Sequence, residues 1–192
     1  MRHSVSTAML ALVLGAACKT EAPARLPLAE PLVLAGSDGR AHDLRAEIAR
    51  STLTVFVFYS QSCPCLRVHE PRLRALAEAY RGRGVSLLIV DSEVGAEPAT
   101  DAAAAKQRAY PFALLTDRGA KLAKAVHARF ATHAVVVDAS GAIRYSGGID
   151  SDKNRLHEDA RPYLRQALDE ILAGREPPVR DREPLGCALE LD

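Results

Sequence analysis

Hydrophobic residues along the chain form two continuous runs, with a stretch of helical periodicity between them. Residues 53–60 (LTVFVFYS) and 85–91 (VSLLIVD) are almost entirely apolar, which is typical of strands buried on both faces of a sheet. The stretch between them predicts a helix that ends near Gly82 and Gly84. Its apolar positions at helical spacing are Leu66, Leu73, Leu76 and Tyr80.

The pattern beyond residue 91 continues to alternate between helical and strand-like segments. It predicts helices over 97–110, 118–130 and 157–174, a short strand over 112–117, and a hairpin over 133–148 with its turn at 138–141. Asp150 and Asp152 offer caps for the segment that follows the hairpin. Strand–helix units followed by an antiparallel pair predict an α/β fold, a mixed central sheet flanked by helices.

The N-terminus has the anatomy of an export signal. Residues 1–18 (MRHSVSTAMLALVLGAAC) begin with a cationic Arg2 and continue with an apolar run too short to span a membrane. The run ends in LGAAC, which resembles the lipobox of bacterial lipoproteins and makes Cys18 the lipid-bearing residue. We therefore expect a periplasmic protein anchored to a membrane, with residues 19–31 as a flexible Pro/Ala tether. The alternative is a cleaved signal with an incidental cysteine.

Charge and cysteine content narrow the function. The chain has 25 Lys and Arg against 24 Asp and Glu, so there is no electrostatic case for binding nucleic acid. It has four cysteines, and lipidation of Cys18 leaves Cys63, Cys65 and Cys187. An odd number of thiols in an oxidising compartment favours a reactive thiol or a metal site over purely structural disulfides.

Cys63 lies where the first apolar run ends and the helical pattern begins. A thiol at a helix N-terminus faces unpaired backbone N–H groups and the positive end of the helix dipole, so its pKa falls. Pro64 suits the first helical position because it lacks the N–H that would be unsatisfied there. Cys63 is thus the candidate nucleophile. Cys65 is one candidate for the resolving thiol, and a Cys63–Cys65 disulfide would be strained and easily reduced. Cys187 is the other, if the Pro-rich tail (176–192) folds back over the site.

The same cluster supports a second class of function. Cys65 and His69 are four residues apart on one helix face. Together with Cys63 and His133 they would supply two thiolates and two imidazoles, a ligand set that suits Cu(I) or Zn. Without a metal, an imidazolium at His133 close to Cys63 could instead lower the pKa of the thiol.

Longer stretches of sequence resemble a known family. The stretches are FYSQSCPCLRVHEPRLRALAEAYRGRGVSLLIVDS, AYPFALLTDRGAKLAKAVHARFATHAVVVDASGAIRYSGGIDS, PYLRQALDEILAGREPP and GCALEL. In their order they resemble the thioredoxin fold, and more closely the exported redoxins related to the alkyl hydroperoxide reductase/thiol-specific antioxidant (peroxiredoxin-like) group. The similarity covers roughly residues 32–189 and implies a thioredoxin-like domain over 32–175. It also implies that Cys63 is the redox residue, and a terminal Gly-Cys, here Gly186-Cys187, recurs in the family.

The sequence departs from the family pattern at three points. One residue, not two, separates Cys63 from Cys65. No proline precedes Ser60 or Ser62, although either could supply the hydroxyl that peroxiredoxins place before their reactive cysteine. His133 takes the place of the cis-proline that abuts the reactive sulfur, and because a cis bond before another residue costs about 3–4 kcal/mol, we expect this bond to be trans.

These observations predict an exported thiol–disulfide oxidoreductase. Cys63 attacks as thiolate, and Cys65 or Cys187 resolves the mixed disulfide or sulfenate. Pro64, Ser62 and His133 support the site. The expected partners are a disulfide or a peroxide as substrate and a thiol reductant, and no cofactor is expected. The alternative is a copper-binding or copper-delivering protein similar to the Sco proteins, which share this fold with a cysteine pair and a distal histidine. A third possibility is a redoxin remnant that serves as a binding module.

Overall fold

The structure is a computed structural model that describes residues 23–28 and 30–191. The predicted signal (1–18) and Cys18 lie outside these residues. Across the described ranges, the search for a helix long and apolar enough to cross a membrane finds none.

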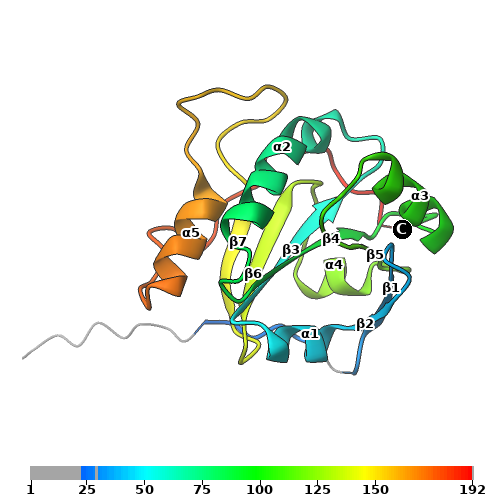
Figure 1. Ribbon diagram of the computed structural model, residues 1–192, viewed down its shortest axis with the longest axis horizontal. Helices are drawn as coiled ribbons and strands as arrows, with labels where there is room; N and C mark the ends of the chain where they lie inside the picture. The colour runs from blue at the N-terminus through cyan, green and yellow to red at the C-terminus, as the bar shows by residue number, and fades with distance from the viewer. Residues whose placement is uncertain (1–22, 29, 192) are drawn as a thin grey trace, which may run out of the picture.

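Seven strands form one mixed sheet in the order β2-β1-β5-β4-β3-β6-β7 (Figure 1). The strands are β1 Val33–Gly36, β2 Ala41–Asp43, β3 Leu53–Tyr59, β4 Val85–Asp91, β5 Leu114–Thr116, β6 His133–Asp138 and β7 Ile143–Gly148. β3 pairs in parallel with β4, which pairs in parallel with β5, whereas β6 runs antiparallel to β3 and to β7. The predicted α/β fold with a mixed sheet is confirmed.

Five helices accompany the sheet. They are α1 Leu44–Arg50, α2 Pro64–Ala79, α3 Pro98–Gln107, α4 Lys121–Ala125 and α5 Tyr163–Leu172. The C-terminal end of α2 lies beside α5 (Figure 1), where the Tyr80 hydroxyl donates to the Asp169 carboxylate at 2.8 Å and the Arg165 carbonyl at 3.2 Å. This contact joins the long helix that begins at the candidate site to the last helix of the chain.

The two apolar runs form the middle of the sheet, as predicted. Every residue of β3 is buried, because α-helices cover its faces and β4 and β6 pair with its two edges. β4 is buried over its second half. Because β3 is held on all sides, the position of its carboxyl end is fixed. The loop that carries Cys63 begins at that end.

Several elements differ from the sequence prediction. The β1–β2 hairpin and α1 were not predicted, because strands of four and three residues carry too few positions for a clear alternation. α4 covers only residues 121–125 of the predicted 118–130, since Ala120 and His127 on either side adopt positive φ angles of 55° and 54° and interrupt the helix.

α5 begins at Tyr163, not at His157 as predicted. Side chains hold the preceding segment as a loop: the Asp152 carboxylate accepts from the backbone N–H of His157 at 2.8 Å, and Ser151 Oγ accepts from the backbone N–H of Arg161 at 2.9 Å. These bonds satisfy N–H groups that a helix would otherwise use.

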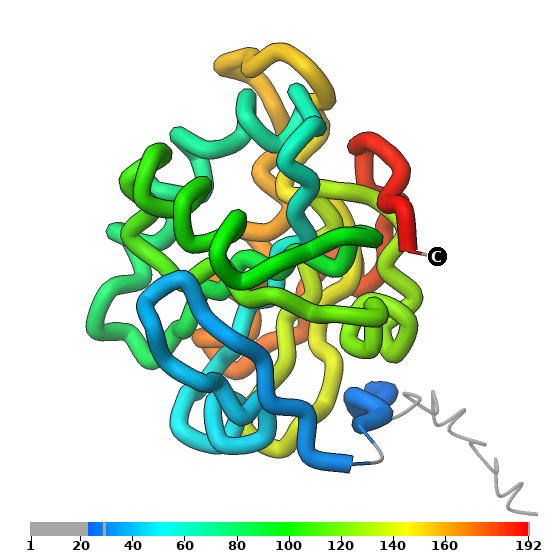
Figure 2. The backbone as a smooth tube through the Cα atoms, turned by 90° about the vertical axis from the view of Figure 1, so that its right-hand side faces the viewer, coloured from blue at the N-terminus to red at the C-terminus, as the bar shows by residue number. Residues whose placement is uncertain are grey.

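Both segments that flank the predicted domain contact it. In the described part of the predicted tether, Leu26 N–H donates to the Gly141 carbonyl at 2.8 Å, and the Ala24 carbonyl accepts from Ile143 at 2.7 Å. The C-terminal tail returns to the sheet. In Figure 2 it runs beside the segment that precedes β6, where Phe130 and Ala188 form an antiparallel bridge.

Candidate active site

The loop after β3 places Cys63 at the N-cap of α2. Its backbone is extended (φ −74°, ψ 112°), its N–H donates to the Ser60 carbonyl at 3.2 Å, and Pro64 is the first helical residue. The predicted position of the thiol at the helix N-terminus and of proline after it is confirmed. The hydroxyls of Ser60 and Ser62 lie 3.1 Å apart and bond to each other, so each has a partner other than Cys63.

Three sulfur atoms meet at this N-terminus. The Sγ atoms of Cys63, Cys65 and Cys187 all lie within 4.8 Å of one another, and Cys187 Sγ is 4.0 Å from Cys65 Sγ. All three are free thiols; Cys63 and Cys65 are buried, and Cys187 is partly buried. The tail therefore brings Cys187 close to the two cysteines at the start of α2, although Cys187 and Cys65 are 122 residues apart in sequence.

Backbone hydrogen bonds hold the tail against the segment before β6. Ala131 N–H donates to the Cys187 carbonyl and Leu189 N–H donates to the Arg129 carbonyl, both at 2.9 Å. The approach is closest at Gly186, where a Cβ atom would lie 1.7 Å from the carbonyl oxygen of Ala131. Only glycine fits there, which gives the terminal Gly-Cys pair a physical reason.

The Cys63 thiol is the acidic one of the three. Burial raises its pKa, but hydrogen bonding by the Cys187 thiol and by the backbone N–H groups of Leu66, Cys187 and Cys65 outweighs burial and lowers it. These donors are the unsatisfied groups of the first helical turn, joined by groups of the tail. The Cys187 thiol is also within hydrogen-bonding distance of Cys65 Sγ, at 4.0 Å.

The other two thiols are held in the protonated form. Burial and the negative charge of Cys63 raise the pKa of Cys65. Burial, the hydrogen bond to Cys63 and the charges of Cys63 and Cys65 raise the pKa of Cys187 to about 12. Ionisation of Cys63 therefore disfavours the loss of a proton from either neighbour.

His133 lies at the start of β6 and is buried. Its Nε2 lies 2.8 Å from Ser146 Oγ, and burial lowers its pKa to about 4, with a smaller opposing effect from the charge of Asp181. At neutral pH the ring is uncharged, so the prediction that its imidazolium lowers the pKa of Cys63 is wrong. The described residues contain no cis peptide bond, so the expected trans bond before His133 is confirmed.

His69 is buried, with 1 % of its surface exposed, and both of its ring nitrogens have partners. Nδ1 lies 2.7 Å from the Cys65 carbonyl oxygen and Nε2 lies 3.1 Å from Asp150 Oδ1. Burial lowers the pKa of His69, but the bonds to Asp150 and to the carbonyl raise it overall. The spacing of four thus places the ring on the backbone of Cys65 and not on its sulfur.

Asp150 is a residue that sequence reasoning considered only as a cap. Its carboxylate forms a hydrogen bond with the His69 ring and an ion pair with Arg72, and both of these residues belong to α2. Arg72 also forms an ion pair with Asp152 at 2.9 Å. Asp152 in turn holds the His157 ring at 2.8 Å. The loop between β7 and α5 is therefore fastened to the first turns of α2. The signal was weak, because His69 and Asp150 are 81 residues apart.

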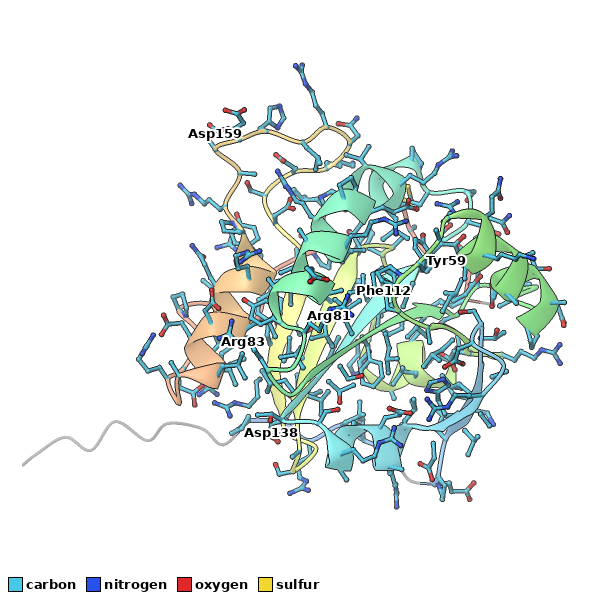
Figure 3. The ribbon with its side chains drawn as sticks, viewed as in Figure 1. Tyr59, Arg81, Arg83, Phe112, Asp138 and Asp159 are labelled. Carbon is cyan, nitrogen blue, oxygen red and sulfur yellow. The ribbon has the colours of Figure 1, made fainter. Side chains whose placement is uncertain are left out.

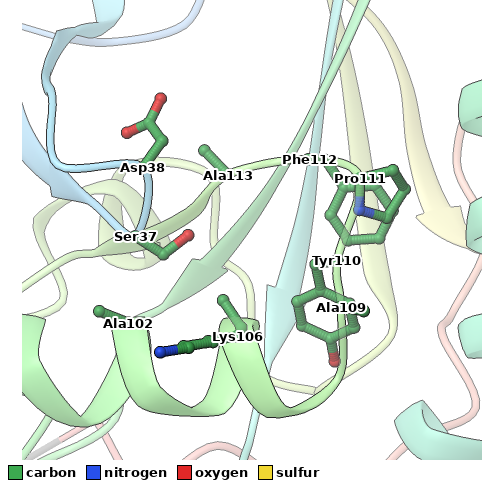
Figure 4. Close-up of a pocket in the computed structure, with 10 residues that line it drawn as sticks. Ser37, Asp38, Ala102, Lys106, Ala109, Tyr110, Pro111, Phe112 and Ala113 are labelled. Carbon is green, nitrogen blue, oxygen red and sulfur yellow. The ribbon is translucent and has the colours of Figure 1, made fainter.

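Two further polar features lie away from the thiols. At the carboxyl end of β4, burial and the charge of nearby Asp101 raise the pKa of Asp91 to about 7, although the Glu93 N–H opposes them. Tyr59, labelled in Figure 3 at the end of β3, has a buried hydroxyl without a hydrogen-bond partner. Figure 4 shows a pocket that α3 and the loop after β1 help to form; no cysteine lines it. Its polar lining residues are Ser37, Asp38, Lys106 and Tyr110.

A mixed sheet with an acidic thiol where its central strand passes into a helix defines a thioredoxin-fold protein of the thiol oxidoreductase class. The family model described as Redoxin matches residues 19–161. The match covers most of the chain, so the chain belongs to the Redoxin family. Comparison with curated proteins finds none that matches.

Solved structures share the fold over most of the chain. An uncharacterized conserved protein from Geobacillus kaustophilus has a TM-score of 0.78 at 25% identity, covering 89% of this chain and 92% of its own. A hypothetical protein from Sinorhizobium meliloti has a TM-score of 0.78 at 23% identity, covering 89% and 94%. The bacterioferritin comigratory protein of Xanthomonas campestris, described for alkyl peroxide reduction, has a TM-score of 0.57 at 18% identity, covering 80% and 96%.

The role of the Cys187 thiol as a hydrogen-bond donor can be tested by Cys187→Ala. The variant removes the donor and leaves Cys63 with backbone N–H groups only, so the pKa of Cys63 should rise. Site-resolved alkylation of Cys63 against pH measures it. Cys187→Ser keeps an O–H donor and should stay closer to the parent; equal midpoints in the parent and Cys187→Ala would contradict the assignment.

The His69–Asp150 pair should make stability depend on pH. The folded pKa of His69 is raised, so its contribution is complete below about 6.5, its unfolded value, and is lost as pH rises through the folded pKa. The folded pKa of Asp150 is lowered, so its contribution is present above about 3.9 and is lost as pH falls.

His69→Gln should therefore lower the free energy of unfolding by about 1–3 kcal/mol at pH 6 and by less at pH 9. Urea unfolding at both pH values measures the difference. His157→Gln is the control, because the ring of His157 is half exposed and its pair with Asp152 should contribute less than about 1 kcal/mol. The same deficit for His69→Gln at both pH values would show that the histidine is uncharged in the fold.

Proposed function

We propose that the protein exchanges dithiol for disulfide, with Cys63 as the attacking thiolate and Cys187 as the resolving thiol. The observation that carries the proposal is the placement of Cys187 Sγ within 4.8 Å of Cys63 Sγ in a buried site. The nucleophile and its resolving partner are already in contact before any substrate arrives.

The reaction then has two balanced steps. The Cys63 thiolate attacks a substrate disulfide, forms a mixed disulfide and expels one substrate thiolate. Cys187, once deprotonated, attacks the Cys63 sulfur, forms the Cys63–Cys187 disulfide and expels the second substrate thiolate. The substrate is reduced by two electrons and the protein is oxidised by two, and an external thiol reductant reverses the change in the protein.

The negative charge of ionised Cys63 determines the order of these two steps, because it disfavours ionisation of Cys187 until Cys63 has reacted. The pKa of Cys187 is raised to about 12 partly by its bond to Cys63 and by the charge of Cys63. Both causes end when Cys63 becomes part of a disulfide. The pKa of Cys187 then falls, and the second nucleophile forms only after the first has reacted.

Cys187 is favoured over Cys65 by its place on the chain. Cys65 lies inside the first turn of α2, where the helical backbone fixes the position of its sulfur. Its sulfur cannot approach Cys63 without a change in the helix, because a disulfide requires a separation of about 2 Å. Cys187 lies on the tail, outside the helices and strands, so no helical backbone fixes its sulfur.

A disulfide is favoured over a peroxide as substrate, because the Ser60 and Ser62 hydroxyls bond to each other and neither is directed by a bond toward Cys63. A peroxide would leave a sulfenate on Cys63, which Cys187 could also resolve. Cys63 is 1 % exposed, so a bulky disulfide reaches it only when the tail moves aside.

Gly186→Ala and the cysteine variants test the proposal. A Cβ at position 186 has no room against Ala131, so the tail should be displaced. Alkylation of Cys63 should then accelerate while steady-state reduction of a protein disulfide falls, by about tenfold or more, because the resolving thiol is no longer in place. Gly148→Ala is the control, since its Cβ would meet its neighbours at ordinary contact distances of 3.4 Å and above.

Trapping experiments identify the resolving thiol. Cys187→Ser should accumulate the mixed disulfide at Cys63, whereas Cys65→Ser should turn over like the parent and Cys63→Ser should be inactive. Accumulation in Cys65→Ser alone would assign resolution to Cys65. Faster consumption of hydrogen peroxide than of any disulfide by the parent would make the protein a peroxidase.

We further propose export to the periplasm with a lipid anchor on Cys18, supported by the apolar run that ends in LGAAC. The intact mass of the membrane-fraction protein should show a diacylglyceryl-modified N-terminus at Cys18, and Cys18→Ser should abolish it. A mature protein cleaved at another position, with Cys18 absent or unmodified, would refute the anchor.

A further inference from the structure

We propose that the three thiols of the reduced protein also form a three-coordinate site for Cu(I), with Cys63, Cys65 and Cys187 as its ligands. This activity is separate from disulfide exchange, and the ligand set differs from the two thiols and two imidazoles that the sequence suggested. It rests on the mutual placement of the sulfur atoms in the fold.

The sulfur positions suit a trigonal metal. At a metal–sulfur distance of about 2.3 Å, three thiolates around one ion are about 4.0 Å apart. Cys187 Sγ and Cys65 Sγ are 4.0 Å apart, and no pair among the three exceeds 4.8 Å. Small rotations of the side chains bring Cys63 to the same separation. No change in the course of α2 or of the tail is needed.

The surroundings of the sulfurs exclude harder ligands. Among the described residues, no histidine or carboxylate joins the cluster of three cysteines. Both ring nitrogens of His69 are engaged, and Nε2 of His133 bonds to Ser146. Nδ1 of His133 has no hydrogen-bond partner, but it is not among the ligand atoms that lie within 4.8 Å of one another. A set of three sulfurs without a fourth ligand suits a soft ion that accepts low coordination, whereas Zn²⁺ favours four ligands.

The fold can stabilise the negative charge of a copper complex at this site. Binding of Cu(I) releases the thiol protons to solvent and leaves the complex negatively charged. Cys63 is the N-cap of α2, where the unpaired backbone N–H groups and the helix dipole stabilise negative charge. The copper stays in the +1 state, so no electron is transferred in this step.

Metal binding and disulfide exchange exclude each other. A Cys63–Cys187 disulfide removes two of the three ligands, so only the reduced protein can hold the ion. Bound copper in turn occupies the sulfur that attacks a disulfide. The redox state of the tail cysteine therefore decides which of the two chemistries the site performs.

Anaerobic Cu(I) transfer from a chromogenic bidentate chelator tests the site on the full reduced chain carrying Cys18→Ser, so that Cys18 contributes no ligand. One equivalent should transfer, and X-ray absorption should show three sulfur neighbours at about 2.3 Å and no nitrogen. Cys63→Ser, Cys65→Ser and Cys187→Ser should each weaken binding by at least about tenfold.

His133→Ala and His69→Gln are the matched controls and should bind Cu(I) like the parent. No transfer to the parent would overturn the site, and so would unchanged affinity in Cys187→Ser or weakening in His133→Ala. The outcome is independent of turnover, because copper transfer and the X-ray absorption spectrum report metal binding directly and need no disulfide substrate.

Discussion

The site depends on how the fold stabilises the ionised form of a sulfur that is buried away from water. Burial of a thiolate is costly, and it is the largest single influence on the pKa of Cys63, which it raises. Donors from two sources reverse the result: the first turn of α2 supplies backbone N–H groups, and the tail supplies the Cys187 thiol and N–H. Neither source is complete alone, so the acidic thiol is a property of the helix and the tail together.

This dependence makes the tail part of the thiol cluster. Backbone bonds to residues 129–131 hold it in the manner of an added strand, and Gly186 permits the close approach. The bonds are few, and Leu185 beside them is exposed. A segment held by a few backbone bonds can leave and return at modest cost, as a buried nucleophile requires if it is to meet a bulky disulfide.

The sequence was sufficient for features set by neighbouring residues. The buried strands follow from continuous apolar runs, and the position of Cys63 follows from the change of pattern and from Pro64. It was insufficient for contacts between distant segments. Nothing local indicates that His69 meets Asp150, and the i,i+4 spacing of Cys65 and His69 fits a metal pair as well as a ring on a carbonyl. Likewise the sequence indicates that Asp150 and Asp152 can cap a helix, but it does not indicate that both pair with Arg72.

Three thiols in one buried cluster raise the question of how a single negative charge is shared. While Cys63 holds it, Cys65 and Cys187 remain protonated, because each additional anion would lie within 4.8 Å of the first in a medium that screens it poorly. Two events relieve this repulsion: oxidation removes the charge from Cys63, and a bound cation neutralises part of it. Both permit a second thiol to lose its proton. The repulsion that would order the steps of the proposed disulfide exchange is therefore the same one that the proposed binding of a soft cation would relieve.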